Sequence, residues 1–411
     1  MGAFSAFKDK KRQTASETPT VASHYIKLGR KIATLRYIVL AFVVAFAVYS
    51  LSFHSDEITI ENFRYMLKFI NLGEEAETPE GGVITFDGSA GNKGILFKGD
   101  LAVMNESGLT VTGWDGEVLL KSDFMFDHPK MVENGINLFC YDIGGNDIKV
   151  FNSYSRVWSP EKPFEYPIYG LAASQKGGFA VITSQKGYRS AVHVYDSAFR
   201  LIYSRLFGDD CVDFVDINKN GDEFITAAHF SEKGNLVTRI SRFKTDAEDA
   251  VSSSTFVGEI PLGVYYTENG YALMTSEALR FFDNDGNNIG TVEFKGRELL
   301  SGRIYGKYAL VTYGLNGLSG GAQAVVYDLN GNTVLEKQFS SSLSDTSVCG
   351  EKLYALSPGA LSETDIASGK EKVYSVPTSF SSLVRDGDRV ILFSENRAEY
   401  FESKNFERQE Q

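Results

Sequence analysis

The sequence predicts an all-β protein, an eight-bladed β-propeller, that follows one transmembrane helix and a short amphipathic helix beside the membrane. Three observations carry this prediction. From residue 83 onward, short apolar strands and tight turns recur in units of about 40 residues, a period typical of propeller blades. One apolar run, Tyr37 to Phe53, contains no charged residue. Basic residues precede this run and acidic residues follow it, as in a membrane anchor of defined orientation.

The apolar run is the predicted transmembrane segment. Its 17 residues make roughly 25 Å of helix at about 1.5 Å per residue, and extension to 32–54 brings the helix to the ~30 Å of a bilayer core. Residues 1–31 show no apolar period and are expected to form a basic, mostly disordered tail in the cytoplasm. Cleavage as a signal peptide at Ala45-Phe46-Ala47 is the competing interpretation, but it leaves a short apolar core behind an unusually long N-terminal region.

Charge orients the anchor. Residues 1–36 carry eight Lys or Arg and two acidic residues, a net charge of +6, whereas the rest of the chain carries 33 basic and 51 acidic residues, a net charge of −18. The positive-inside rule therefore predicts a single-pass protein of the cell membrane with a cytoplasmic N-terminus and an extracytoplasmic propeller. The negative charge of that large domain argues against nucleic acid as a partner.

Residues 55–72 are expected to form a juxtamembrane amphipathic helix. Thr59 is a suitable N-cap, Gly73 can end the helix, and the apolar residues between them recur at helical spacing. Its apolar face could lie on the bilayer, bind a partner or cover part of the propeller. Residues 73–82 follow as a short acidic linker.

Residues 83–411 are the predicted propeller. In each unit the third strand ends in an apolar pair, a polar or acidic residue and a turn rich in Gly and Asn. The copies are Val111–Gly116, Val150–Ser153, Val194–Ser197, Phe281–Gly286 and Val326–Gly331, with looser copies at Glu363–Asp365 and Tyr400–Ser403. An Asp side chain in such a turn can accept hydrogen bonds from backbone N–H groups ahead of it, and Gly or Asn tolerates a positive φ.

The eighth unit is inferred around Arg239–Phe243, where a polar insertion at Thr245–Ser254 is expected to replace the turn. Seven blades is the alternative if this weak copy belongs to a neighbouring unit. The last unit ends about ten residues after Phe401, which barely leaves room for a fourth strand. We therefore expect the isolated strand Val83–Phe86 to complete the C-terminal blade.

The three cysteines, Cys140, Cys211 and Cys349, lie far apart in sequence and are expected to be free, buried thiols. The propeller should then be held together by packing. Gly317–Gly321 matches the G-x-S-x-G pattern of hydrolases, but it lies between two predicted strands instead of a strand and a helix, so it is expected to be a hairpin loop.

One segment weakly resembles a calcium-binding loop. Asp216, Asn218, Asn220 and Asp222 have the alternating spacing of an EF-hand start, but Ala227 occupies the position of the bidentate Glu. A partial metal site is the less favoured interpretation, and a turn between two strands is the favoured one. The sequence nominates no catalytic residue, although the carboxylates around Asp209 leave a spatial pair open.

Candidate binding residues lie in the connections between consecutive blades and between second and third strands, where propeller loops converge. Tyr and Arg provide rigid contact area and bidentate hydrogen bonds at protein interfaces. The candidates are Tyr166, Tyr188, Arg189, Asp209 and Asp210.

The order of basic tail, single anchor, the helix start Ile58–Phe63, acidic linker and propeller units resembles an uncharacterised family of membrane proteins from Gram-positive bacteria, a domain of unknown function (DUF5711-like). The resemblance covers roughly residues 30–405 and implies an architecture and an extracytoplasmic address, not an activity. The units also resemble quinoprotein and outer-membrane assembly-factor propellers distantly. Because the chain has only Trp114 and Trp158, it lacks the repeated Trp signature of quinoprotein enzymes, and we expect no cofactor.

These features together favour a non-catalytic interaction scaffold for another membrane or envelope protein. A propeller that binds a cell-wall glycan or a small ligand in its central funnel is the first alternative, and a hydrolase or lyase that uses funnel carboxylates is the second. Aromatic platforms in the funnel would favour the glycan, and facing carboxylates with raised pKa values would favour the enzyme. A flat face with exposed apolar side chains would favour the scaffold.

Overall fold

The computed structural model describes residues 82–88, 91–315 and 320–406, together with four helical residues, Arg36, Tyr37, Leu40 and Val44. The chain divides into two compact units, Met1–Ile70 and Asn71–Gln411. Apart from those four residues and Gly82, the predicted tail, transmembrane segment 32–54, helix 55–72 and linker 73–82 lie outside the described residues. In the part of the chain that is described, no helix has the length and apolar character needed to cross a membrane.

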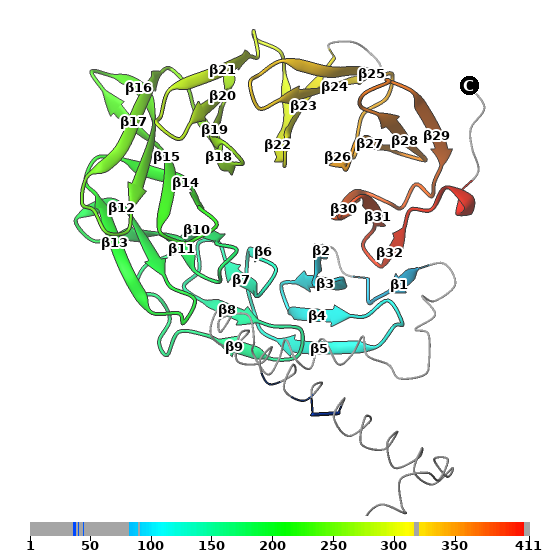
Figure 1. The fold of residues 1–411 in the computed structure, drawn as a ribbon, viewed down its shortest axis with the longest axis horizontal. Helices are drawn as coiled ribbons and strands as arrows, with labels where there is room; N and C mark the ends of the chain where they lie inside the picture. Colours follow the sequence, from blue (N-terminus) through cyan, green and yellow to red (C-terminus); the bar gives the residue numbers. More distant parts are fainter. Residues whose placement is uncertain are drawn as a thin grey trace, which may run out of the picture. The chain divides into compact units, whose positions relative to one another are not determined.

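The second unit is a ring of eight four-stranded antiparallel sheets, so the predicted eight-bladed propeller is confirmed and the seven-bladed alternative is wrong (Figure 1). Blades are numbered here from the first complete sheet. Blade 1 is β2 (Lys93–Phe97), β3 (Asp100–Asn105), β4 (Gly108–Thr112) and β5 (Val118–Asp123); blade 2 is β6 (Pro129–Glu133), β7 (Leu138–Asp142), β8 (Ile148–Phe151) and β9 (Arg156–Trp158); blade 3 is β10 (Ile168–Ala173), β11 (Phe179–Gln185), β12 (Tyr188–Tyr195) and β13 (Leu201–Phe207); blade 4 is β14 (Cys211–Ile217), β15 (Glu223–Glu232), β16 (Asn235–Lys244) and β17 (Ala250–Val257).

The remaining blades follow in chain order. Blade 5 is β18 (Pro261–Thr267), β19 (Gly270–Thr275), β20 (Ala278–Asp283) and β21 (Asn288–Glu293); blade 6 is β22 (Leu299–Tyr305), β23 (Tyr308–Gly314), β24 (Ala322–Asp328) and β25 (Thr333–Phe339); blade 7 is β26 (Asp345–Cys349), β27 (Lys352–Ser357), β28 (Ala360–Asp365) and β29 (Glu371–Ser375); blade 8 is β30 (Ser382–Asp386), β31 (Arg389–Phe393), β32 (Arg397–Tyr400) and β1 (Val83–Thr85). A short 3-10 helix, Ser403–Asn405, follows β32.

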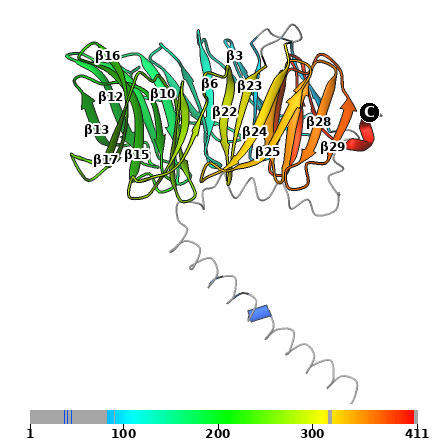
Figure 2. The same ribbon diagram turned by 90° about the horizontal axis from the view of Figure 1, so that it is seen from above.

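The position of a strand in its blade sets its burial. The first strand of each blade lies nearest the centre of the ring and the last lies at the rim, and all strands run between the two faces (Figures 1 and 2). Second strands such as β7 and β19 are buried at every residue because both sheet faces are covered by neighbouring blades. Rim strands such as β17 alternate between exposed and partly buried residues.

The core lies in the seams between blades. In the seam of blades 3 and 4, the rings of Phe224 and Phe243 stack at 5.1 Å between centroids, and Phe207 from blade 3 meets Phe243 edge-on at 5.9 Å. All three cysteines are free, as expected, and Cys140 and Cys349 are also buried. The expected burial is wrong for Cys211, which is partly exposed. Packing between blades therefore holds the ring together without disulfides.

The ring closes where the sequence predicts. Strand β1 pairs antiparallel with β32, with Ile84 opposite Ala398, and so becomes the rim strand of the C-terminal blade. The amide of Tyr400 donates to the carbonyl of Gly82 at 3.1 Å, and the amide of Phe86 donates to Asn396 at 3.0 Å. Joining the two ends of the propeller in one sheet makes every blade depend on both ends of the domain.

The Asp turns also form as predicted. Oδ1 of Asp283 accepts hydrogen bonds from the amides of Asp285 (2.9 Å) and Asn287 (2.8 Å), and Asp328 holds its own turn with the same spacing. Gly286 follows with φ of +89°. The side-chain and backbone hydrogen bonds from Asn287 hold the pKa of Asp283 below its usual range.

One expectation about blade 4 is wrong. The predicted polar insertion Thr245–Ser254 is a turn followed by the first five residues of the rim strand β17. Ser252, Ser253 and Ser254 pair in register with β16. A rim strand buries only one of its faces against a neighbour, so small polar residues suffice there and the segment lacks the apolar pattern of a strand.

Candidate functional site

The predicted binding residues share one end of the blades. Connections between consecutive blades and turns between second and third strands lie at this end, which is called the loop face below. Tyr166 lies between β9 and β10, Tyr188 and Arg189 begin β12, and Asp209 and Asp210 lie between β13 and β14. The structure therefore places all five on the loop face of blades 2 to 4.

Two contacts bring these loops together. Burial and a hydrogen bond to Glu165 raise the pKa of Tyr166, whose hydroxyl also reaches the backbone of Lys186, next to the Tyr188 turn. Ser190 Oγ donates to the carbonyl oxygen of Asp210 at 2.9 Å. The three loops thus form one continuous surface.

Asp210 has a structural task within that surface. Its two carboxylate oxygens lie 2.9 and 2.8 Å from Nη1 of Arg239 in blade 4, and the Arg239 guanidinium lies 4.1 Å from the ring centroid of Phe230. Asp210 is buried, whereas Asp209, Tyr188 and Arg189 are exposed. The exposed residues of this group are the ones available to a partner.

Sequence reasoning missed a row of β-bulges at the start of the first strand in blades 3 to 6. In each of these blades the pairing of first and second strand skips one residue, and the skipped residues are Tyr169, Asp213, Leu262 and Leu300. The first and second strands of the other four blades pair without such a shift over their described registers. A bulge re-aims the unpaired side chain, and these four consecutive bulges turn their residues out of the ladder at the loop-face end of the innermost strands.

Three of the four bulged residues are large, apolar and exposed. The exposed fractions are 48% for Tyr169, 38% for Leu262 and 49% for Leu300. A sequence signal for them exists, because Gly170 and Gly263 directly follow a bulged residue, and a Gly inside a strand often marks a bulge.

The surface of blades 4 and 5 extends this apolar character. Leu236, Val257, Ile260 and Leu262 are all exposed, Val257 by 65% and Ile260 by 53%, and together they are called the apolar patch. The amide of Gly258 donates to the carbonyl of Leu236 at 2.7 Å, so the start of β16 lies beside the end of β17. Several exposed apolar side chains that gather at one connection between blades are typical of an interaction surface.

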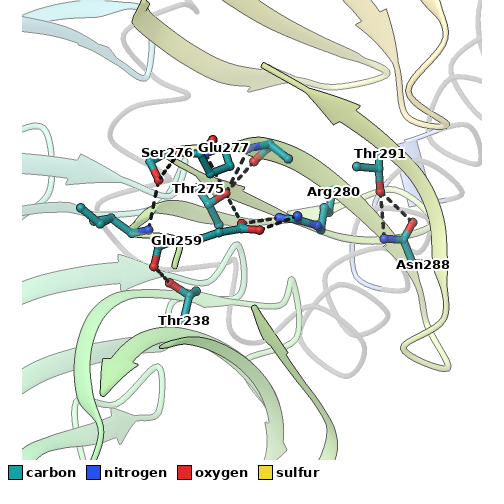
Figure 3. Close-up of polar contacts among 10 residues, drawn as sticks. Thr238, Glu259, Thr275, Ser276, Glu277, Arg280, Asn288 and Thr291 are labelled. Atoms are coloured by element: carbon teal, nitrogen blue, oxygen red, sulfur yellow. Dashed lines mark hydrogen bonds and ion pairs between the residues drawn. The ribbon is translucent and has the colours of Figure 1, made fainter. Parts of the chain in front are cut away.

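The apolar patch rests on a buried polar network centred on Glu259 (Figure 3). The Glu259 carboxylate accepts hydrogen bonds from Arg280 at 2.6 and 2.7 Å and from Thr275 Oγ1 at 2.6 Å, and its backbone carbonyl accepts one from Thr238 Oγ1 at 2.6 Å. Ile260 exchanges two hydrogen bonds with Ser276, at 2.9 and 3.2 Å. These hydrogen bonds fix the backbone of the connection between blades 4 and 5. The side chains of the apolar patch are therefore held in place before a partner binds.

The loop face is not uniform around the ring. Among the described residues, none after Val334 is an exposed large apolar side chain, so blades 7 and 8 lack this character. Most exposed apolar side chains of the loop face lie on blades 3 to 6, and Met125, 82% exposed in the connection between blades 1 and 2, lies outside this group.

Carboxylates in the same blades are engaged by the protein. Asp213 Oδ2 lies 2.7 Å from Nδ1 of His229, and burial raises the pKa of Asp213. The oxygens of Asp216 accept the amides of Ile217 (2.9 Å) and Tyr266 (2.6 Å), and burial raises its pKa to about 6. Each carboxylate therefore has its own partners: Asp213 pairs with His229 within blade 4, whereas Asp216 also binds the amide of Tyr266 in blade 5.

The weak metal candidate forms a turn between β14 and β15. Asn218 Oδ1 accepts the amides of Gly221 (2.8 Å), Asp222 and Glu223, and Asn218 Nδ2 donates to the carboxylate of Asp222 at 2.6 Å. Asn220 lies in the same turn. Across the described ranges, no group of three or more His, Cys, Asp or Glu side chains is placed to hold a metal ion. Of the G-x-S-x-G pattern, Gly317–Ser319 lies outside the described residues, and the strands β23 and β24 flank it as predicted.

Comparisons with known proteins show similarity in fold and identify no activity. The model of a family of unknown function (DUF5711) matches residues 83–407. No curated protein matches the chain. Among solved structures, the C-terminal WD40 domain of Sif2 is similar with a TM-score of 0.53 and 10% identity, covering 77% of this chain and 96% of that one. Apo AztD from Citrobacter koseri is similar with a TM-score of 0.52 and 9% identity, covering 76% and 93%. At these identities the likeness concerns the propeller fold alone.

Proposed function

The chain is a member of the family of unknown function DUF5711, and on that premise we propose that its propeller is a non-catalytic platform that binds another membrane or envelope protein. The binding surface is the loop face of blades 3 to 6, with the apolar patch at its centre. The observation that carries the proposal is the exposure of four apolar side chains around one connection between blades that buried hydrogen bonds hold in place; they are Leu236, Val257, Ile260 and Leu262.

The chemistry of this surface suits a protein partner. Apolar side chains form the centre, and Tyr188, Arg189 and Asp209 from the neighbouring blades supply a polar and aromatic rim. Interfaces between proteins commonly combine an apolar core with a polar rim, and a preorganised surface loses little entropy on binding. Asp213 and Asp216 support no hydrolase proposal, because each carboxylate is occupied by a separate set of partners.

The address is part of the same proposal. The uncharged run from Tyr37 to Phe53 and the charge asymmetry around it support a single-pass anchor with the propeller outside the cytoplasm. Such an anchor would hold the platform near the bilayer, where membrane and envelope proteins are its neighbours. Protease shaving of intact, wall-stripped cells tests this address, since a C-terminal tag that stays protected would contradict the orientation.

Crosslinking in intact cells, followed by pull-down of the full-length protein, tests the binding surface. The double variant Val257→Asp/Ile260→Asp places two charges in the apolar patch and should abolish recovery of the crosslinked protein partner. Val334→Asp is the matched control, because Val334 is an exposed apolar residue on the rim strand of blade 6. Recovery of the same partner by the double variant at the control's level would contradict the proposed surface.

A further inference from the structure

One cysteine of the propeller lies beside a base. Cys211 begins β14, the innermost strand of blade 4, and its side chain is partly exposed at the loop-face end of that strand. The strand register places Cys211 directly opposite His229 on β15. Residues that oppose each other in an antiparallel pair lie on the same face of the sheet, with Cβ atoms about 5 Å apart. The thiol and the imidazole are therefore neighbours at the surface.

A carboxylate orients this imidazole. Asp213 is the residue that the pairing of β14 and β15 skips, and its Oδ2 lies 2.7 Å from Nδ1 of His229. An ionised carboxylate can only accept a hydrogen bond, so Nδ1 of His229 carries the proton. The other nitrogen of the neutral ring, Nε2, then keeps a lone pair. His229 is thus prepared to accept a proton at Nε2.

Neither Nε2 of His229 nor the thiol is engaged elsewhere. Across the residues that the structure describes, no hydrogen bond occupies either group. The neighbouring ion pair of Asp210 and Arg239 is complete in itself, and Arg239 opposes Ala228 instead of His229, which places Arg239 on the other face of the sheet. A nucleophile, a base and an acid that orients the base form the arrangement that activates thiols in proteins.

We propose that Cys211 is a reversible modification site for small aliphatic disulfides, with His229 as the base. Nε2 of His229 takes the thiol proton, and the Cys211 thiolate attacks one sulfur of the disulfide. The S–S bond of the reagent breaks as the new Sγ–S bond forms, and the other half of the reagent leaves as a thiolate that takes up the proton from His229. Attack by a second thiol reverses the reaction. Such exchange needs only an accessible thiol and a base, whereas acyl transfer would also require donors for an oxyanion.

The modified thiol would lie close to the apolar patch. Across blade 4 the register aligns Cys211 with His229 and His229 with Thr238, so the three side chains share one face of the sheet. Thr238 Oγ1 donates to the carbonyl of Glu259 at 2.6 Å, so the connection that carries Ile260 meets this row at Thr238. Two strand spacings, about 10 Å, separate Cys211 from Thr238. An adduct on Cys211 should therefore hinder a protein bound at the patch, a consequence that rests on the proposed function.

Incubation of the purified full-length protein with hydroxyethyl disulfide, followed by mass spectrometry, tests the site without any partner. Cys211 should gain one half of the reagent, and dithiothreitol should remove it again. Folded Cys211→Ser should gain none. A Cys211 that stays unmodified, or modification of the buried Cys140 at the same rate, would overturn the site.

Two histidine variants test the base. His229→Gln should slow adduct formation at least about tenfold at neutral pH. His193→Gln is the matched control, because His193 lies in blade 3 with its Nδ1 2.8 Å from Ser204 Oγ, and the rate should not change. In alkaline solution the thiol ionises without a base, so the His229→Gln and wild-type rates should converge. A deficit that persists in alkaline solution, or equal slowing in His193→Gln, would contradict the role of His229.

Crosslinking and pull-down from intact cells test the effect on the partner. Treatment with hydroxyethyl disulfide before crosslinking should lower recovery of the partner at least about threefold, because a polar group beside an apolar interface core opposes its burial. Recovery by Cys211→Ser should not change. Equal recovery from treated and untreated wild-type cells, with the adduct present, would contradict the effect on binding. Recovery of no partner from untreated cells would instead contradict the proposed function, and the adduct would still form on the purified protein.

Discussion

Glu259 and Arg280 form a two-point ion pair at the connection between blades 4 and 5, with Nη1 2.6 Å from Oε2 and Nη2 2.7 Å from Oε1. Both side chains are nearly buried, and the Arg280 guanidinium also covers the ring of Phe256 at 4.1 Å. Glu259 lies between Val257 and Ile260 in the sequence, so the stability of the connection and the presentation of the apolar patch depend on the same contact.

Arg280→Met should lower the free energy of unfolding by about 3 kcal/mol, because it leaves the Glu259 carboxylate with little solvent and no cation. Denaturant unfolding of the purified protein measures this change. The control is Arg200→Met, which removes an arginine from an exposed pair with Asp196 and should cost less than about 1 kcal/mol. Equal losses in the two variants would show that burial of the Glu259 pair has no energetic consequence.

Because β1 closes the ring, a substitution in this strand of only three residues should strongly lower the stability of the propeller. Ile84 is 3% exposed and packs in the seam of blades 8 and 1, so Ile84→Ala should destabilise the propeller by about 2 to 4 kcal/mol. Thr85→Ala on the same strand changes an exposed side chain and should cost less than about 0.5 kcal/mol. Thermal unfolding of both variants distinguishes a closing strand from a peripheral one, since a peripheral strand would give two similar small shifts.

Asp216 predicts a specific pH dependence of stability. Because burial raises its pKa from 3.8 to about 6, the folded state holds a proton that the unfolded state has already released in that pH range. The contribution of this group to stability is therefore complete below about pH 4 and is lost as the pH rises toward 6. At about 1.4 kcal/mol for each pH unit of that window, the loss amounts to about 3 kcal/mol.

Asp216→Asn provides the comparison, because it removes the titration. The difference in free energy of unfolding between wild type and variant should change by about 3 kcal/mol between pH 4 and pH 7 and then stay constant. Only the pH dependence of this difference is informative. The side chain of the Asp216→Asn variant has an NH2 group in place of one oxygen that accepts a backbone N–H, so the variant also loses stability at every pH. A difference that is the same at pH 4 and pH 7 would contradict the raised pKa.

The three thiols should differ in reactivity. Cys140 and Cys349 are buried, and burial raises the pKa of both, whereas Cys211 is partly exposed at the start of β14. An alkylating reagent should modify only Cys211 in the folded protein, and all three after unfolding. Mass spectrometry of labelled peptides measures this, and Cys211→Ser should leave the native protein unlabelled. Labelling of Cys140 as fast as Cys211 would contradict the described core.

Local features of the chain were predictable. The Asp283 side chain binds only the amides two and four residues ahead of it. The turn therefore forms from local sequence alone, and its pattern identifies a blade whatever packs against it. Closure by Val83–Phe86 could be predicted from the lone strand and the incomplete last unit. The rim strand β17 was mistaken for an insertion, because Ser252–Ser254 satisfy a ladder that the sequence pattern does not reveal.

The blade repeat, its count and its closure are thus properties of the amino-acid sequence, since each rests on short turns and on apolar strands of fixed period. The sequence also pointed to the loops that carry Tyr188 and Asp210, but not to the apolar patch. That patch depends on packing between blades: a skipped residue turns Leu262 outward, and Arg280 reaches Glu259 across 21 positions. Side chains that neighbouring sheets bring together are set by the closed ring, because their proximity arises from the rotation between blades and not from spacing along the chain.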